Sequence, residues 1–271
     1  MHLWDPRAHY YPWLCDAPPI AFRYGDYRAL RRPYLAADYR ADSAAWPVAR
    51  TVYIEAEWDP KDPQGEMDFI AGIRRQAGFP TVAIAQAWLD AGDCAAVLEA
   101  HARREFVRGV RHKPKPGQMD DPRWRAGYAR LAPLGLHFEL QAPWRQVGEA
   151  ARLAGDFPGT AIVLNHAGLP LADQMEGWRG AMRVLAGFPN VMVKISGLGN
   201  LNKPESRAAA LAVIDLFSPR RALFASNHPV DSLRASFDAI FREFDEATRG
   251  FSEAERRALF HDNAVRIYRM E

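Results

Sequence analysis

The stretch Gly187-Phe188-Pro189-Asn190-Val191-Met192-Val193-Lys194-Ile195-Ser196 shows how this chain is built. Glycine and proline end a helix, and the apolar, β-branched run that follows favours a buried strand. The segment before it, Met175–Ala186, has apolar residues at the spacing of an amphipathic helix. A helix, a short turn and a strand in this order form the repeating unit of an α/β protein.

The same unit recurs along the chain and predicts a barrel. Apolar runs begin roughly 25 to 30 residues apart, the length of one strand and one helix. The predicted strands are Thr51–Ala56, Thr81–Gln86, Phe106–Arg111, Leu136–Gln141, Ala161–Asn165, Val191–Ser196 and Arg221–Ser226. The predicted helices between them are Met67–Ala77, Ala95–Arg103, Trp144–Ala154, Met175–Ala186, Ala208–Phe217 and Phe237–Thr248. With a partial strand also expected at the N-terminus, interpreted as a truncated first strand, the count predicts an α/β fold, a (β/α)8 TIM barrel in a single domain over residues 1–271.

Composition excludes several classes of protein. The chain has 271 residues, of which 48% are hydrophobic and 25% charged, as in ordinary globular proteins. The net charge of +2, with dispersed basic residues, predicts no nucleic-acid partner. No apolar run reaches about 18 residues, which predicts no membrane span. Two cysteines, Cys15 and Cys94, are too few for a disulfide scaffold, so a cytoplasmic location is expected.

The expected partner is a small-molecule substrate. The chain has no GxGxxG after its first strand and no GxxxxGK[ST], which disfavours an open nucleotide-binding sheet. Residues 9–47 are rich in aromatic residues, arginine and proline, without a clean period. A loop this long is usually a functional cover. We expect an irregular covering segment, and the sequence leaves open whether its rings contact substrate. It also leaves open whether the chain forms a homo-oligomer.

Polar side chains gather where the predicted strands end, which is the catalytic rim of a TIM barrel. They are His2, Glu55, Glu57, Gln86, Arg111, His112, Glu139, Gln141, Asn165, His166, Lys194, Ser196, Asn227 and His228. The planar guanidinium of Arg111 suits a carboxylate or a polarised carbonyl. Lys194 interrupts an apolar run, so it either lines the site or needs a salt-bridge partner, for which Glu55 is a candidate. From its position, His166 suits a general base, a metal ligand or a hydrogen-bond donor.

The run Phe224-Ala225-Ser226-Asn227-His228-Pro229-Val230-Asp231 is the corner where the last strand meets the predicted site. Polar residues follow an apolar run abruptly, and the proline stops the strand. A carboxylate at position 227 would be a natural general base, but asparagine cannot accept a proton. Proton transfer is therefore expected to fall to His166, with His228 and Asp231 as alternatives.

Six short motifs together carry a family resemblance. They are His2-Leu3-Trp4-Asp5-Pro6, Val107-Arg108-Gly109-Val110-Arg111, Leu164-Asn165-His166-Ala167-Gly168, Val193-Lys194-Ile195-Ser196-Gly197-Leu198, Phe224-Ala225-Ser226-Asn227-His228-Pro229-Val230 and Asn263-Ala264-Val265-Arg266-Ile267-Tyr268. In this order they resemble the amidohydrolase-related TIM-barrel hydrolases, in the branch with sugar lactonases and 2-pyrone-4,6-dicarboxylate lactonase. The resemblance implies that His2 is the second histidine of a His-x-His pair, that His166 is the sixth-strand histidine, and that Asn227 replaces the family's acid.

The resemblance also bears on metal binding. A catalytic Zn²⁺ takes three ligands from His, carboxylate and Cys side chains and keeps one position open. Here the first histidine of the pair would lie before Met1, and Asn227 is a poor ligand. The resemblance to the lactonase branch also implies that a metal is often not needed. We therefore predict no cofactor and no tightly bound metal; if a divalent metal such as zinc binds, His2 and His166 would hold it.

These observations predict a metal-independent or weakly metal-dependent hydrolase of a small anionic or polyhydroxylated lactone, or of a related cyclic ester or amide. In this hypothesis His166 takes the proton and Asn227 orients the water or the carbonyl. The residues expected to bind substrate are Arg111, His112, Glu55, Lys194, Ser196 and His228. The alternatives are a catalytically weakened barrel that binds a carboxylated metabolite without turnover, and a decarboxylase-like lyase.

Overall fold

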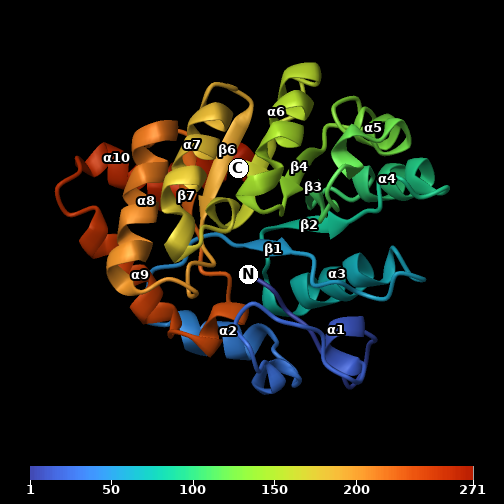
Figure 1. Cartoon of the computed structure of the whole chain (residues 1–271). Coiled ribbons are helices and arrows are strands. Elements are labelled where there is room, and N and C mark those ends of the chain that lie inside the picture. Colours follow the sequence, from blue (N-terminus) through green and yellow to red (C-terminus); the bar gives the residue numbers. More distant parts are fainter. Residues whose placement is uncertain (271) are drawn as a thin grey trace.

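Seven parallel strands form one sheet whose order in space follows their order in the chain (Figure 1). The computed structural model describes residues 1–270. The strands are β1 (Val52–Ile54), β2 (Val82–Gln86), β3 (Val107–His112), β4 (His137–Leu140), β5 (Ile162–Leu164), β6 (Val191–Ile195) and β7 (Ala222–Phe224). Each lies at a predicted strand, and β3 alone extends one residue beyond its predicted range. Parallel strands in sequential order, joined by helices, have the topology of a TIM barrel, as predicted.

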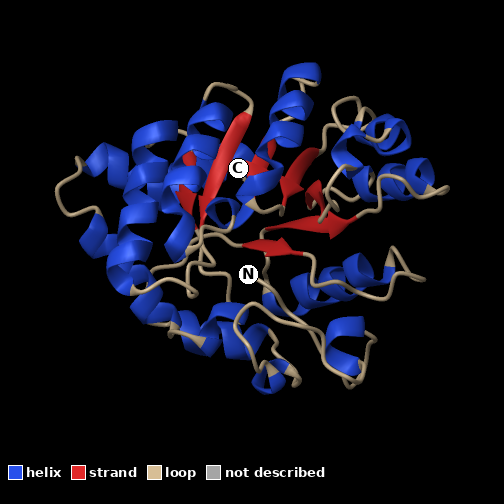
Figure 2. Cartoon of the chain, in the orientation of Figure 1, coloured by secondary structure: helices blue, strands red, loops and turns tan. Residues whose placement is uncertain are grey.

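Helices connect the strands and surround them, as Figure 2 shows. They are α1 (Pro12–Cys15), α2 (Ala36–Ser43), α3 (Gly65–Ala77), α4 (Cys94–Ala102), α5 (Pro122–Tyr128), α6 (Val147–Asp156), α7 (Met175–Ala186), α8 (Lys203–Phe217), α9 (Phe237–Ala247), α10 (Glu253–Arg257) and α11 (Asn263–Tyr268). The predicted helical segments correspond to α3, α4, α6, α7, α8 and α9. The others are too short to show a clear helical period. Within residues 1–270, no helix has the length and apolar character needed to cross a bilayer.

Local signals set where the helices begin and end. α3 ends at Gly78, whose φ of 76° is in the left-handed region that glycine adopts without strain. α8 begins with a capping box: Asn202 Oδ1 accepts from Glu205 N at 2.9 Å, and Glu205 Oε2 accepts from Asn202 N at 3.1 Å. These signals fix the start of each following element, and so determine which residues reach the rim.

Met1 and His2 occupy the position between β1 and the segment after β7. The Met1 nitrogen donates to Val52 O at 2.9 Å, and Ile54 N donates to Met1 O at 2.9 Å. This is the hydrogen-bond pattern of a parallel strand pair. On the other side, His2 N donates to His228 O at 2.9 Å. The expected partial first strand is therefore present as two residues that bridge the two ends of the sheet.

Alternation along the strands places an apolar layer inside the barrel and a charged layer beside it. The apolar cluster consists of Ile54, Val82, Ile84, Val163, Met192, Leu223, Tyr268 and Met270. Lys194 comes two residues after Met192 on β6, so it points to the same interior side. Arg111 and Glu139 are register partners on β3 and β4 and also point inward. The charged layer lies toward the carboxyl ends of the strands.

The N-terminal segment, residues 9–47, folds against the rest of the chain through its aromatic rings. It includes α1 and α2 and lies beside the strands in Figure 1. Tyr34 and Trp4 exchange backbone hydrogen bonds of 3.0 and 2.9 Å, which fasten the segment to the start of the chain. Tyr11, Tyr27 and Tyr34 are buried, so these rings pack as core.

Asn263 should prove important for stability, because it joins α11 to β7. Its buried Nδ2 donates to Pro219 O at 2.6 Å and to Ala222 O at 2.7 Å. Asn263→Ala leaves the two acceptors without this donor, so we expect the free energy of unfolding in urea to fall by about 1–3 kcal/mol. The control is His261→Ala, a half-buried side chain nearby, which should change it by less than about 0.5 kcal/mol. Equal losses in the two variants would contradict this role.

Candidate active site

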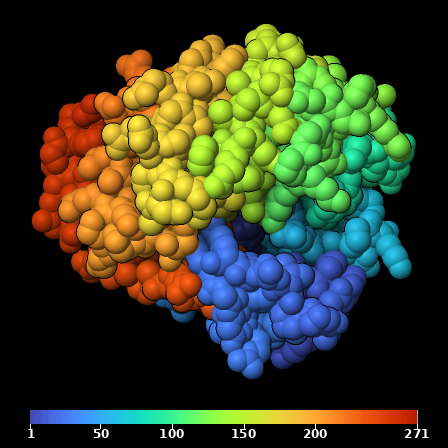
Figure 3. Space-filling model, in the orientation of Figure 1, coloured from blue at the N-terminus to red at the C-terminus, as the bar shows by residue number. Residues whose placement is uncertain are grey.

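A cavity of about 290 Å³ lies at the carboxyl ends of the strands, under the N-terminal segment. On the surface, Figure 3 shows a hollow between that segment, in blue, and the cyan and green part of the barrel. We call this first cavity the outer cavity. A second cavity, the inner cavity, has a volume of about 450 Å³, lies between β1 and β7 and reaches the interior. The side chains that line both cavities are His2, Arg111, His166 and Asn227. The candidate site is where the two cavities meet.

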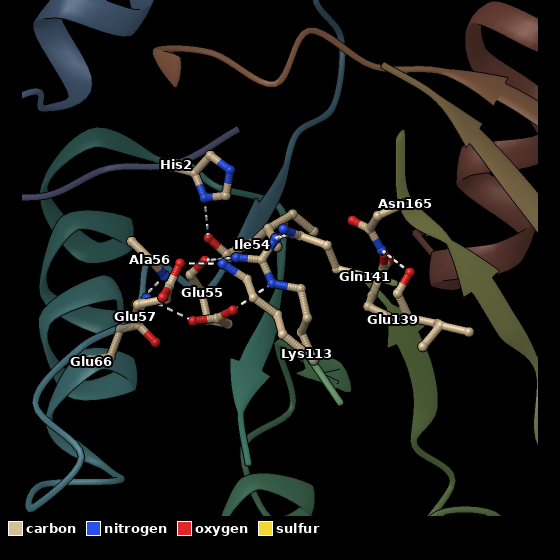
Figure 4. A network of polar contacts seen from close by, with 12 residues as sticks. His2, Ile54, Glu55, Ala56, Glu57, Glu66, Lys113, Glu139, Gln141 and Asn165 are labelled. Atoms are coloured by element: carbon tan, nitrogen blue, oxygen red, sulfur yellow. Dashed lines mark hydrogen bonds and ion pairs between the residues drawn. The ribbon is translucent and has the colours of Figure 1, made fainter. Parts of the chain in front are cut away.

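Arg111 is buried, and most of its hydrogen-bond donors are used. Nε donates to a Glu55 carboxylate oxygen, Nη2 donates to Glu55 O at 2.6 Å, and Nη1 donates to Gln141 Oε1 at 3.2 Å. Figure 4 shows Glu55, Gln141 and their neighbours. A guanidinium has five N–H donors, so with three used, two remain for a ligand. Burial opposes ionisation of Glu55, but Arg111 and Lys113 outweigh it and hold the pKa of Glu55 below its usual range.

Glu139 is the centre of a second buried ionic group. Its Oε2 accepts from Lys194 Nζ at 2.7 Å and from Asn165 Nδ2 at 2.7 Å, and its Oε1 accepts from Tyr268 Oη at 2.6 Å. Burial alone would raise the pKa of Glu139, but Lys194 and His137 hold that pKa below its usual range. Burial lowers the pKa of Lys194, although Glu139 opposes this. Lys194 is therefore committed to Glu139.

His166 follows β5 in a tight turn in which its own φ is 55°. Nδ1 lies 2.9 Å from Ser196 Oγ. Gly197 leaves room for the ring, because a Cβ there would lie 2.6 Å from Nδ1. Burial, and after it the positive charge of Arg23, lowers the pKa of His166 well below its ordinary value, so the imidazole is neutral at neutral pH. When Nδ1 donates to Ser196, the Nε2 lone pair is free to accept a proton.

The side chains of Asn227 and His2 place two hydrogen-bond acceptor atoms close together in the site. Asn227 has a φ of 50°, a left-handed conformation that asparagine tolerates. Its Nδ2 donates to Asp231 Oδ1 at 2.6 Å, so its Oδ1 points to His2 Nε2, 3.4 Å away. His2 Nδ1 lies 2.9 Å from Ile54 O, which can only accept, so the ring proton is on Nδ1 and Nε2 is also an acceptor. Burial lowers the pKa of His2 and keeps the ring neutral. One hydrogen of a water molecule, donated between the two acceptors, would satisfy both and leave the other hydrogen of that water free.

Asp231 is a buried carboxylate behind Asn227. In addition to Asn227, it accepts hydrogen bonds from Tyr24 Oη at 2.9 Å and from Gly197 N at 3.1 Å. Burial raises the pKa of Asp231. The side chain lines neither of the two cavities described above, so it is poorly placed as the alternative base. Its contacts instead fix which end of the Asn227 amide faces the site.

The structure brings together most of the predicted site residues and separates others. Four of them line both cavities: His2, Arg111, His166 and Asn227. The inner cavity is also lined by Lys194 and Ser196, and Glu55 binds Arg111. The expected pairing of Lys194 with Glu55 is wrong, because each has another buried partner.

Two predicted substrate contacts, His112 and His228, line neither cavity. His112 follows Arg111 in β3, and successive strand residues point to opposite sides. Its Nδ1 accepts from Trp124 Nε1 at 3.0 Å, so the ring packs against a helix. The ring of His228 packs edge-on against Phe237, with the ring centres 5.4 Å apart. Both histidines are therefore placed to support the structure.

Arg23 lines the outer cavity but is absent from the predicted site. It belongs to the N-terminal segment, which has no strand or helix period to assign its side-chain directions. The one available signal was the arginine-rich composition of that segment, and composition does not single out a residue.

The donor set does not fit a catalytic zinc site. Within residues 1–270, no three His, Cys, Asp or Glu side chains come together as metal ligands. His2 and His166 line the same cavity, but the third side chain is the neutral amide of Asn227, and zinc in catalytic sites prefers three His, Cys or carboxylate ligands. The nearby carboxylates of Glu55 and Asp231 are already engaged by Arg111 and by Asn227.

Comparison with known proteins shows full-length similarity. The sequence matches the family described as Amidohydrolase over residues 1–270. It is 39% identical to the uncharacterized protein y4mH of Sinorhizobium fredii, over 99% of this chain and 96% of that protein. It is 26% identical to L-fucono-1,5-lactonase of Burkholderia multivorans, over 98% of this chain and 93% of that protein. The crystal structure of a Burkholderia multivorans amidohydrolase with bound zinc has a TM-score of 0.85 at 24% identity, covering 100% of this chain and 97% of that one.

The pairing of Lys194 with Glu139 can be tested by a double-mutant cycle. Lys194→Met leaves Glu139 buried without its cation, so we expect the free energy of unfolding to fall by about 3–5 kcal/mol. Adding Glu139→Gln should restore part of this loss, giving a coupling energy above about 1 kcal/mol. The matched control is the cycle of Lys194→Met with Glu55→Gln, where the coupling should be smaller. A larger coupling with Glu55 would contradict the observed partners.

Proposed function

The chain belongs to the amidohydrolase family, and on this basis we propose that it hydrolyses a small anionic or polyhydroxylated lactone, or a related cyclic ester or amide. Similarity to L-fucono-1,5-lactonase over nearly the whole chain supports a lactone substrate. The observation that carries the proposal is the convergence of three groups: a neutral histidine, an arginine with unused donors, and a pair of acceptors suited to one water molecule.

Each group has a role in opening a lactone ring. The water donates one hydrogen to the acceptor pair of Asn227 Oδ1 and His2 Nε2 and its other hydrogen to His166 Nε2. The two remaining donors of Arg111 polarise the carbonyl oxygen. His166 Nε2 removes a proton from the water as the water oxygen bonds to the carbonyl carbon. The ring C–O bond then breaks, and the imidazolium returns the proton to the leaving oxygen. The product is a hydroxy acid.

The pH dependence of kcat/KM should identify the base. A base must be neutral to accept a proton, and burial lowers the pKa of His166, so the neutral form persists into acid. We expect kcat/KM to rise along a single limb centred below about 6.5, the ordinary histidine value, and then to stay level. His166→Gln should remove this limb and lower kcat by roughly 10²–10⁴-fold.

The matched variant in this experiment is His2→Gln, which should lower kcat/KM but keep the limb, because His2 holds the water without taking its proton. If His166→Gln leaves turnover unchanged, or if the limb disappears only in His2→Gln, the assignment of the base is wrong.

Metal dependence can be measured directly. We propose that turnover needs no tightly bound metal, because the site offers two histidines and one amide as ligands. Dialysis against EDTA should leave kcat/KM within about twofold, and added Zn²⁺ should not raise it further. Loss of activity on dialysis, followed by recovery with Zn²⁺, would show that these ligands suffice for a catalytic metal.

A further inference from the structure

The Arg23 guanidinium has few hydrogen-bond acceptors within reach inside the protein. It lines the outer cavity, and its side chain is 27% exposed. Its ion-pair partner among residues 1–270 is Asp231, and the distance of 3.7 Å is too long for a direct hydrogen bond. Asp231 is already occupied by donors from Tyr24, Asn227 and Gly197. The Arg23 donors are therefore left for a ligand.

The other cations of this cavity are in a different situation. Arg111 uses three donors on Glu55 and Gln141, and Lys113 is paired with the Glu57 carboxylate. Arg23 is thus the cation in this cavity whose charge is least neutralised by a bound carboxylate. An anionic group entering the cavity would meet a planar fork suited to a carboxylate.

Tyr24 anchors Arg23 in place. Tyr24 is buried, and its Oη donates to Asp231 Oδ1 at 2.9 Å and accepts from Gly199 N at 3.3 Å. Arg234 Nη2 donates to Tyr24 O at 3.0 Å. The Arg23 guanidinium lies over the Tyr24 ring, 4.6 Å from its centre, which limits its motion.

Arg23 also lies next to the reacting groups. A Cβ added to Gly197 would lie 2.6 Å from His166 Nδ1 and 2.7 Å from Arg23 Nη2, so the two side chains meet over this glycine. A substrate that presents its carbonyl to His166 and Arg111 therefore has Arg23 beside it. This position beside His166 suits a carboxylate carried on or next to the lactone ring.

We propose that Arg23 is a specificity-determining residue that binds a carboxylate of the substrate, so that the site prefers an anionic lactone to a neutral one. This inference rests on the proposed lactone hydrolysis and narrows its substrate class. The N-terminal segment then contributes directly to recognition, in addition to covering the site.

The test compares two probes that differ only in charge: γ-butyrolactone-γ-carboxylate and its carboxamide. Wild-type protein should prefer the carboxylate, and Arg23→Ala should raise KM for the carboxylate by roughly 10- to 100-fold while kcat changes little. KM for the carboxamide should stay within about twofold, because a neutral group loses no ion pair. Arg23→Lys keeps the charge but not the planar fork, so its KM for the carboxylate should lie between that of the wild type and that of Arg23→Ala.

The matched control is Arg28→Ala, which removes the same charge from an exposed position in the same segment, paired with Asp26 outside the cavity. It should leave both KM values unchanged. Binding of both probes is also measured by calorimetry, so that recognition is judged separately from turnover. Absence of turnover with an intact, Arg23-dependent preference for the carboxylate would overturn the proposed hydrolysis alone. No preference in the wild type, or an undiminished preference in Arg23→Ala, would overturn the role of Arg23.

Discussion

The interior of this barrel contains ionised side chains that must be paired to be tolerated. Removing a charge from water at this depth costs several kcal/mol, and a nearby opposite charge with good geometry offsets that cost. Glu55 with Arg111, and Glu139 with Lys194, meet this requirement, and Tyr268 adds a hydrogen bond from the C-terminal helix. These contacts join the residue after β1 to β3, and join β4 to β6, so they connect non-adjacent parts of the sheet across the interior.

The same pairing determines which groups remain available for chemistry. Lys194 is bound to Glu139, and three of the five Arg111 donors are used by Glu55 and Gln141, so little of the positive charge inside the barrel is free to bind a ligand. The groups that face the cavity are mostly uncharged: a neutral His166, the acceptor atoms of His2 and Asn227, and two Arg111 donors. The carboxylate beside Asn227, that of Asp231, lines neither cavity and orients the Asn227 amide. Such a site is suited to holding water and a carbonyl, with a histidine moving the proton.

Strand and helix positions followed from sequence because each depends on local signals. Apolar runs bounded by glycine and proline predicted β1 to β7, and Met175–Ala186 coincides with α7. The position of Arg111 and Lys194 at the ends of predicted strands also placed both at the rim. It did not predict their partners, because which inward residues meet depends on the register and curvature of the whole sheet. The omission of Arg23 has a similar cause, since an irregular segment gives no rule for where its side chains point.

By itself, the sequence determined the parallel α/β architecture, the rim that carries the polar groups and the presence of an amide, Asn227, at the end of the last strand. Periodicity, helix termini and residue identity are local properties, so one chain suffices to establish them. Tertiary structure alone decided that Lys194 pairs with Glu139, that His112 and His228 point away from the site, and that Tyr24 holds Arg23 beside His166. These contacts join residues far apart in the chain, and their geometry exists only once the sheet has closed around the buried charges.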